Sequence, residues 1–336
     1  MIHSFALFAL FALFACSHGE PFASAPPDSL GPFTSTLPRP LTLNPAADVT
    51  PSAAGDTVVF SRQDEGRPDG DYCLALLPLE GGTLYGTRCA GGLEPDTVRD
   101  AWLNPVISPD RARLAYLRDR EVVRSGRELG HVLVVAPWTF PDSATIVVRG
   151  SYPLSDTTVG NAFRRPAWAG DGAIRFLGGL EESGPNATFV PGGVWEVPVG
   201  ADPAPEPHRI PELADAVAFS QRGDGAVFFL SGSDPTGVYQ WLPGTAPSPV
   251  APFTCDDTAT LAQLTAVAAG TGGVAAIGTC LTPAGSRIRL LWNPLDSGGP
   301  VRWLRLPVEP EHVTGVPGRP RLIVESGGDL WLVGIP

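Results

Sequence analysis

The stretch ISPDRARLAYL (107–117) joins a tight turn to a short apolar strand, and this combination decides the fold. Asp and Pro favour the turn, because Asp can bond its own backbone and Pro fixes φ. Six copies of the arrangement recur at spacings of 47 to 60 residues, a period typical of repeat architectures. The other copies are TPSAAGDTVVFS (50–61), WAGDGAIRFL (168–177), FSQRGDGAVFFL (219–230), AVAAGTGGVAAIG (266–278) and GVPGRPRLIVES (315–326).

Further short strands accompany each copy. An alternating segment follows, for example DYCLALLPLEGG (71–82) and HVLVVAPWTFPD (131–142), with more strand candidates on either side. Short runs of β-branched and aromatic residues bounded by Gly, Pro and Asp are strand signals. Four strands per unit predict an all-β, six-bladed β-propeller with four-stranded antiparallel blades over residues 44–336. A pair of stacked sheets is the alternative fold.

The sixth unit has no fourth strand of its own in the sequence. The segment GPFTSTLPRPLTLN (31–44) precedes the first unit and can supply that strand. Pairing of this segment with the last blade would cover an exposed strand edge. We therefore expect an N-terminal strand to close the last blade.

The turns resemble those of the TolB-type, WD-repeat-like propeller family over roughly residues 44–336. In the fifth and sixth copies the Asp is missing. The resemblance implies a tight hairpin between the first two strands of a blade. It also implies periplasmic partners, such as envelope proteins or other lipoproteins. The best matches are Ser108-Pro109-Asp110, Gly170-Asp171-Gly172 and Gly223-Asp224-Gly225.

The N-terminus is typical of an export signal. Residues 5–15 read FALFALFALFA, which is too short for a membrane span of about 20 residues. The end of this run, Leu13 to Cys16, resembles the lipobox of bacterial lipoproteins, and Ser17 resembles an outer-membrane sorting residue. We expect a signal peptide (1–15), a lipidated Cys16 with a Pro-rich tether and the ring-closing strand (16–43), and the propeller (44–336). An ordinary cleaved signal with an incidental Cys is the alternative.

Composition excludes several classes of protein. All 23 basic residues are Arg, so Schiff-base enzymes, P-loop proteins and kinases, which need a Lys, are excluded. The net charge of −12 argues against a nucleic-acid partner, which requires a basic face. Gly 39 and Pro 37 argue against long helices. The anionic body is expected to meet the membrane through the lipid anchor alone.

Four cysteines follow Cys16, an even number that suggests disulfides in an exported chain. Cys73 and Cys89 lie symmetrically about a Glu-Gly-Gly turn, which would place them opposite each other in a hairpin. Cys255 precedes the fifth unit and Cys280 lies at the end of its second strand, on the same expected rim. We predict the pairs 73–89 and 255–280. A metal site is the alternative, although no CxxC or clustered His accompanies them.

Charged residues lie where the innermost strands are predicted to begin, which is one mouth of the central channel. Their convergence predicts a polar site for a peptide, a sugar or a cation; solvated rim charges are the alternative. The candidate residues are Asp100, Arg164, Arg165, Asp215 and His312.

No nucleophile elbow, HExxH motif or phosphate-binding loop occurs in the sequence. We therefore expect no catalytic residues, metal or cofactor, and a non-catalytic scaffold that binds proteins at the cell envelope, on the outer membrane facing the periplasm. One alternative is a hydrolase or lactonase-like enzyme with a cation in the channel. The other is a sugar- or peptide-binding module.

Overall fold

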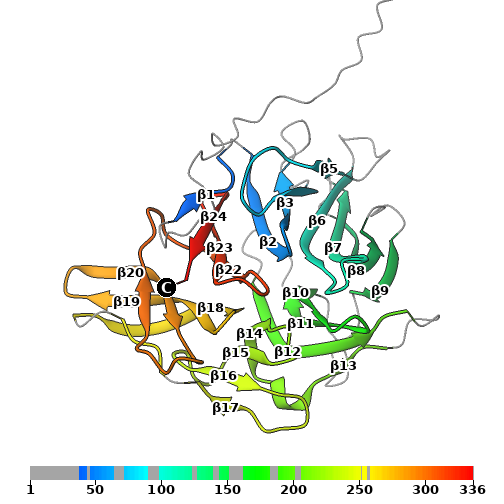
Figure 1. Ribbon diagram of the computed structural model, residues 1–336. Coiled ribbons are helices and arrows are strands. Elements are labelled where there is room, and N and C mark those ends of the chain that lie inside the picture. Colours follow the sequence, from blue (N-terminus) through cyan, green and yellow to red (C-terminus); the bar gives the residue numbers. More distant parts are fainter. Residues whose placement is uncertain are drawn as a thin grey trace, which may run out of the picture.

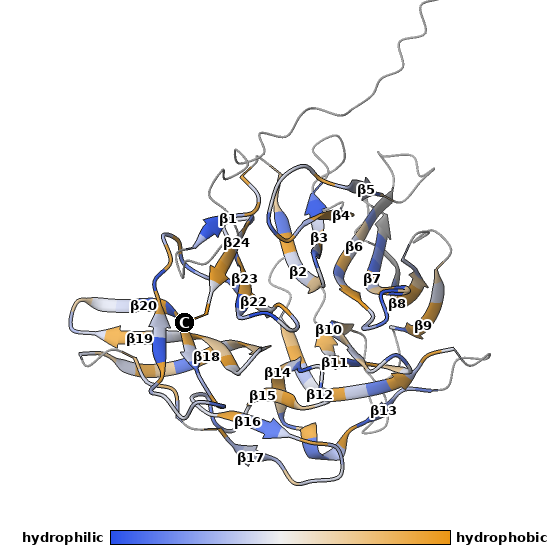
Figure 2. Cartoon of the chain, in the orientation of Figure 1, coloured by the Kyte–Doolittle hydropathy of each residue, from blue (hydrophilic) through white to orange (hydrophobic). Residues whose placement is uncertain are grey.

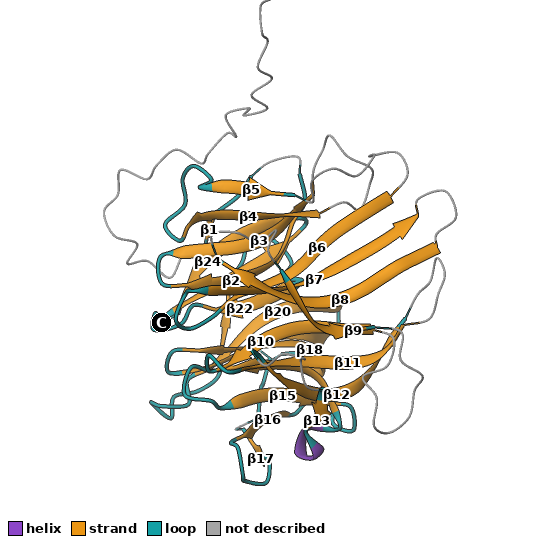
Figure 3. Ribbon diagram, turned by 90° about the vertical axis from the view of Figure 1, so that its right-hand side faces the viewer, coloured by secondary structure: helices purple, strands orange, loops and turns teal. Residues whose placement is uncertain are grey.

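The computed structural model describes residues 38–43, 46–63, 72–89, 98–122, 127–138, 144–150, 162–181, 188–200, 206–250, 252–255 and 258–335. They form six four-stranded antiparallel sheets arranged as blades around a central axis (Figure 1). Within these ranges the helical structure is one 3-10 turn, η2 (Pro211–Leu213), visible in Figure 3. The predicted six-bladed propeller is confirmed. In the described part no helix is long and apolar enough to span a bilayer.

The strands of each blade run outward from the axis in chain order, except in blade 6. Blade 1 consists of β2 (Asp48–Ala54), β3 (Thr57–Gln63), β4 (Tyr72–Pro78) and β5 (Gly86–Arg88). Blade 2 consists of β6 (Val98–Ile107), β7 (Arg113–Val122), β8 (Arg127–Pro137) and β9 (Thr145–Arg149). Blade 3 consists of β10 (Ala162–Ala169), β11 (Ala173–Glu181), β12 (Phe189–Pro198) and β13 (His208–Arg209).

The remaining blades complete the ring. Blade 4 consists of β14 (Ala216–Gln221), β15 (Val227–Ser231), β16 (Val238–Trp241) and β17 (Ser248–Pro249). Blade 5 consists of β18 (Thr260–Gly270), β19 (Gly273–Thr282), β20 (Gly285–Asn293) and β21 (Arg302–Leu304). Blade 6 consists of β22 (His312–Gly315), β23 (Arg321–Ser326), β24 (Asp329–Gly334) and, as its outermost strand, β1 (Arg39–Pro40).

The hydrophobic core lies between neighbouring blades. Alternate residues of the inner strands face the next sheet, and Figure 2 shows hydrophobic residues along these strands. Between blades 2 and 3, for example, Leu133 packs in one cluster with Phe163 and Phe176, whose rings meet edge to face at 5.6 Å. Each sheet therefore buries apolar side chains against its neighbours, and the ring holds the inner strands in fixed positions.

The N-terminal strand closes the last blade, as predicted. β1 pairs antiparallel with β24, and the Leu41 N–H donates to the Leu330 carbonyl at 2.7 Å. The Leu41 side chain is buried in a cluster shared by blades 6 and 1. Arg39 bridges to Glu80 of blade 1 at 2.6 Å, and Arg321 of blade 6 forms an ion pair with the same carboxylate. Residues from both ends of the described chain thus join the same seam.

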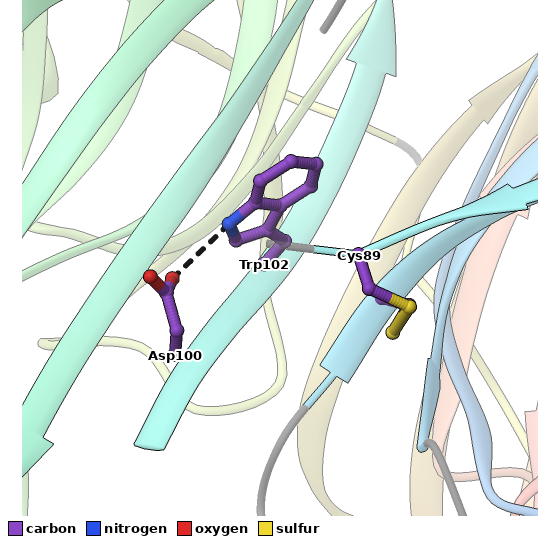
Figure 4. The surroundings of a disulfide bond; sticks show 4 residues. Cys89, Asp100 and Trp102 are labelled. Atoms are coloured by element: carbon purple, nitrogen blue, oxygen red, sulfur yellow. Dashed lines mark hydrogen bonds between the residues drawn. A yellow bond between two sulfur atoms is a disulfide. The ribbon is translucent and has the colours of Figure 1, made fainter. Parts of the chain in front are cut away.

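Both predicted disulfides are present. Cys73 on β4 is joined to Cys89, directly after β5, with a Cα–Cα distance of 4.5 Å. Cys255, in the connection before β18, is joined to Cys280 on β19 at a Cα–Cα distance of 6.0 Å. The first bridge ties the outer strand of blade 1 to its neighbour, close to Trp102 of blade 2 (Figure 4). The register inferred from the cysteine spacing is therefore confirmed.

Candidate functional site: the central channel

A cavity of about 740 Å³ occupies the axis of the ring. Its walls are the inner strands β2, β6, β10, β14, β18 and β22, from the middle of the strands to the turns that follow most of them. Pockets of this size commonly hold small ligands. The cavity opens among the hairpin turns, whereas the sequence analysis placed the site at the end where the inner strands begin.

Three successive blades carry the same irregularity on the channel wall. Thr50, Asn104 and Arg165 have positive φ angles of 51°, 52° and 53°, and each precedes a proline. At these positions the pairing between first and second strands shifts register, which marks a β-bulge. A left-handed φ is unfavourable for residues other than Gly, and the following proline further restricts the backbone. The three sites therefore store backbone strain beside the cavity.

Hydrogen bonds between blades satisfy two of these bulges. The Thr50 N–H donates to Glu325 Oε2 of blade 6 at 2.7 Å. The Asn104 N–H donates in turn to Thr50 Oγ1 at 3.2 Å, and Ser61 lies at the same distance from that hydroxyl. Glu325 thus serves the structure, because its carboxylate satisfies a backbone N–H that the bulge releases from the sheet.

Arg165 occupies the equivalent position in blade 3 and faces the cavity. Within the described ranges its guanidinium makes no hydrogen bond, ion pair or ring contact. Burial, followed by the positive charge of Arg164, lowers the pKa of Arg165. An arginine nevertheless stays protonated in proteins. Arg165 therefore presents an unpaired positive charge to the cavity.

His312 of β22 also lines the cavity. Burial, together with the positive charge of Arg165, lowers the pKa of His312 to about 3, so the imidazole is neutral near pH 7. The pKa of Glu325, its cross-strand partner on β23, is raised by burial in spite of the bond from Thr50. The charged side chains at this depth are therefore Arg165, which lines the cavity, and Glu325, which lies on β23 behind the inner strand.

Of the five residues predicted to converge on the channel, Arg165 and His312 line the cavity. Asp100 does not, because its side chain is buried inside blade 2. There it accepts from Arg118 Nη2 at 2.6 Å and from Trp102 Nε1 at 3.1 Å (Figure 4). Asp100 is thus part of a buried ion pair that links the first two strands of its own blade.

Asp215 and Arg164 lie outside the cavity lining too. Asp215 accepts hydrogen bonds from the hydroxyls of Ser231 and Ser233, and these bonds, the one from Ser231 first, lower its pKa. Arg164 is exposed, and its guanidinium lies 4.6 Å from the centre of the Phe189 ring. The prediction that all five residues line one channel mouth is therefore corrected: two of them, Arg165 and His312, line the cavity.

Thr50, Asn104 and Glu325 are not among the site residues predicted from the sequence. A signal for the first two exists, since the dipeptides Thr50-Pro51, Asn104-Pro105 and Arg165-Pro166 occur once per unit just before the repeated turn. The role of Glu325 has no local signal, because its partner lies 275 residues away in the chain.

The described residues contain no group of three or more His, Cys, Asp or Glu side chains placed to hold a metal ion. The cysteines that the sequence analysis weighed as metal ligands are the four disulfide cysteines. Cys16 lies outside the described residues.

Replacing His312 with Gln is expected to flatten the pH dependence of stability. Unfolded His binds a proton below about pH 6.5, whereas folded His312 stays neutral down to about pH 3, so acid favours the unfolded state. In that window His312 lowers the free energy of unfolding by up to about 1.4 kcal/mol per pH unit, and protonation of Glu325 opposes this. Urea denaturation at pH 7, 6 and 5 measures the slope.

His208→Gln is the matched control, because the His208 side chain is 60% exposed and lies on an outer strand. That variant is expected to keep the wild-type slope. Equal slopes for wild-type protein and His312→Gln would contradict the prediction.

No protein-family model matches the sequence, and a search of curated proteins found no relative. Several solved structures are similar to this chain at low sequence identity. TolB from Acinetobacter baumannii is 14% identical, with a TM-score of 0.48 over 84% of this chain and 65% of that one. A gluconolactonase from Xanthomonas campestris is 15% identical, with a TM-score of 0.47 over 87% and 86% of the two chains.

A puromycin-hydrolysing peptidase from Mycobacterium tuberculosis is 16% identical, with a TM-score of 0.47. The match covers 82% of this chain and 49% of that one, so this chain spans about half the length of the peptidase. At these identities the likeness concerns the fold alone. The sheet topology itself shows that the chain is a six-bladed propeller.

Proposed function

We propose that the protein is a non-catalytic binding protein of the cell envelope, which holds a partner protein at the face where its cavity opens. One observation carries the proposal: a 740 Å³ cavity opens among the inner turns of five blades. A propeller fixes such turns on a rigid scaffold, and loops held in this way are common recognition surfaces.

The enzyme alternative requires a cation in the channel. The charged side chain that faces the cavity from the bulged strands is Arg165, and a positive charge at that depth repels a metal ion. The positive charge at the depth of Arg165 therefore favours binding of a partner over metal-assisted hydrolysis. Metal analysis of the purified protein tests this step, and one equivalent of tightly bound metal would contradict it.

Crosslinking in intact cells tests the protein-binding role. A photoreactive residue at Pro109 or Pro317, both exposed and on the cavity face, is expected to capture the same discrete envelope protein. Leu242 is the control position, since it is 43% exposed and lies outside the cavity lining. Capture of that protein from Leu242, or no capture from the two cavity positions, would overturn the proposal.

The location of the protein belongs to the same proposal. Its support is the run FALFALFALFA (5–15) followed by Cys16, which resembles a lipoprotein signal. Several acyl chains on Cys16 would anchor the chain stably. Cys16→Ser is expected to abolish labelling by radioactive palmitate and to move the protein from the outer-membrane to the periplasmic fraction. Ser17→Ala is expected to change neither result, and labelling of Cys16→Ser would contradict acylation.

A further inference from the structure

We infer that Arg165 binds the carboxylate of a ligand with an apolar body, either a small organic acid or the free C-terminus of a partner chain. The inference rests on the proposed function to the extent that both use the same cavity. It adds the chemical class of the ligand, the residue that recognises it and the depth at which the recognition occurs.

Arg165 differs from its equivalents on blades 1 and 2. The bulges at Thr50 and Asn104 are part of a hydrogen-bonded chain that links blades 6, 1 and 2. The Arg165 side chain takes part in no such bond within the described residues, although its backbone has the same strained φ of 53°. A strained residue whose side chain makes no stabilising contact is characteristic of functional positions.

The charge in the depth of the cavity favours an anionic ligand. Arg165 contributes one positive charge deep in the cavity, where His312 is neutral. At the rim, Arg222 is paired with Asp224 at 2.7 Å, and one further residue of each charge, Arg111 and Asp296, lines the opening. A lining with one positive charge at this depth, and with Glu325 behind the wall, matches a monoanion, and the net charge of −12 on the whole chain disfavours more highly charged anions. A carboxylate is therefore favoured over a phosphate dianion, and it fits the planar guanidinium in a bidentate manner.

The wall around Arg165 is apolar. Pro51, Pro105 and Pro166 are buried at its level, and Trp168 and Val267 continue the apolar lining. Such a wall accommodates the apolar body of a ligand, whereas the charged head of the ligand requires a polar partner. The cavity volume of 740 Å³ matches the side chains of a few residues or a small organic acid.

Neutral donors lie at the same depth. The side-chain amide of Asn104 and the His312 ring line the cavity, and neither group has a hydrogen-bond partner among the residues that the structure describes. The amide and the ring N–H can donate to a carboxylate oxygen without adding charge. Arg165 supplies the charge, and these two side chains supply the remaining hydrogen bonds to the carboxylate.

Calorimetric titration of the purified full chain tests the inference. The probes are N-acetyl-alanyl-valine as its free acid, the same dipeptide as its amide, hexanoate, and inorganic phosphate. We expect the acid to bind at least about 10-fold more tightly than the amide or phosphate, because both lack a monoanionic carboxylate. Hexanoate binding as tightly as the acid points to small organic acids as the source. Much weaker binding of hexanoate points to a chain terminus. Equal binding of acid and amide, or no binding of either carboxylate, would overturn the inference.

Two neighbouring arginines make a matched pair of variants. Arg165→Gln is expected to weaken binding of the acid at least about 30-fold, since it removes one member of a desolvated charge pair. Arg164→Gln is expected to change binding less than about 2-fold, because Arg164 lies outside the cavity. Arg165→Lys should give intermediate binding, because it keeps the charge and loses the bidentate geometry. Equal effects of the substitutions at 164 and 165 would contradict the assignment.

Stability separates a binding role from a structural one. Arg165→Gly relieves the left-handed backbone, so the melting temperature is expected to stay equal or to rise while binding of the acid is lost. A lower melting temperature for Arg165→Gly would mean that Arg165 supports the fold. Crosslinking from Pro109 and Pro317 without carboxylate binding would overturn this inference and leave the proposed function intact.

Discussion

Replacing Leu41 with Asp is expected to lower the free energy of unfolding by at least about 3 kcal/mol. Leu41 is 5% exposed and lies in the apolar cluster shared by blades 6 and 1. A carboxylate there either stays buried without a partner or releases the N-terminal strand from β24. Both outcomes expose the edge of the last blade, and urea denaturation measures the loss.

Leu43→Asp is the control for this prediction. Leu43 lies two residues further along the chain and is 46% exposed, so the same substitution places its charge in water. We expect the free energy of unfolding to change by less than about 0.5 kcal/mol. Equal losses from the two variants would show that the closing strand contributes through its backbone rather than through the Leu41 side chain.

Replacing Arg62 with Met is expected to lower the free energy of unfolding by about 3–5 kcal/mol, because it removes the guanidinium that is paired with the buried carboxylate of Asp48. Arg62 Nε and Nη2 each donate to Asp48 at 2.6 Å, and the two side chains are 6% and 0% exposed. The pair joins the first two strands of blade 1, as Asp100 and Arg118 do in blade 2.

Two further variants make this result specific. Arg222→Met breaks an ion pair to Asp224 whose carboxylate side chain is 52% exposed, and it is expected to cost less than about 1 kcal/mol. In the double variant Asp48→Leu/Arg62→Met, apolar side chains replace both charges, so it should be more stable than Arg62→Met alone. A double variant less stable than the single one would contradict the account of an uncompensated charge.

The repeat made the fold predictable from sequence. Each turn-and-strand copy specifies its own hairpin through nearby residues, and six copies at similar spacing leave few ways to arrange the sheets. The cysteine pairs followed from the same register, because Cys73 and Cys89 are related by a local turn. Local periodicity was therefore sufficient for the blades, the closing strand and the disulfides.

The site was only partly predictable. The hydrophobic pattern of the sequence does not show whether a charged side chain of an inner strand is paired within its own blade or faces the axis. Asp100 and Arg165 both lie on inner strands, yet Asp100 meets Arg118 within its own blade whereas Arg165 faces the axis. The bulge at Arg165 reverses the expected alternation, and this depends on the backbone conformation before Pro166. The role of Glu325 depends on Thr50, which lies on the neighbouring blade but 275 residues away in the chain.

The closing strand also sets the order in which the protein can fold. The Leu330 N–H donates to Thr42 Oγ1 across 288 residues of chain, so this contact forms after the intervening blades are made. Contacts of such long range are slow to form, although the entropy of loop closure grows only logarithmically with length. During synthesis, residues 38–43 cannot pair until β24 has been made. The open edge of the last blade is exposed to other chains until β1 pairs with β24. Refolding of the full ring should therefore end in a slow phase that reports the docking of β1.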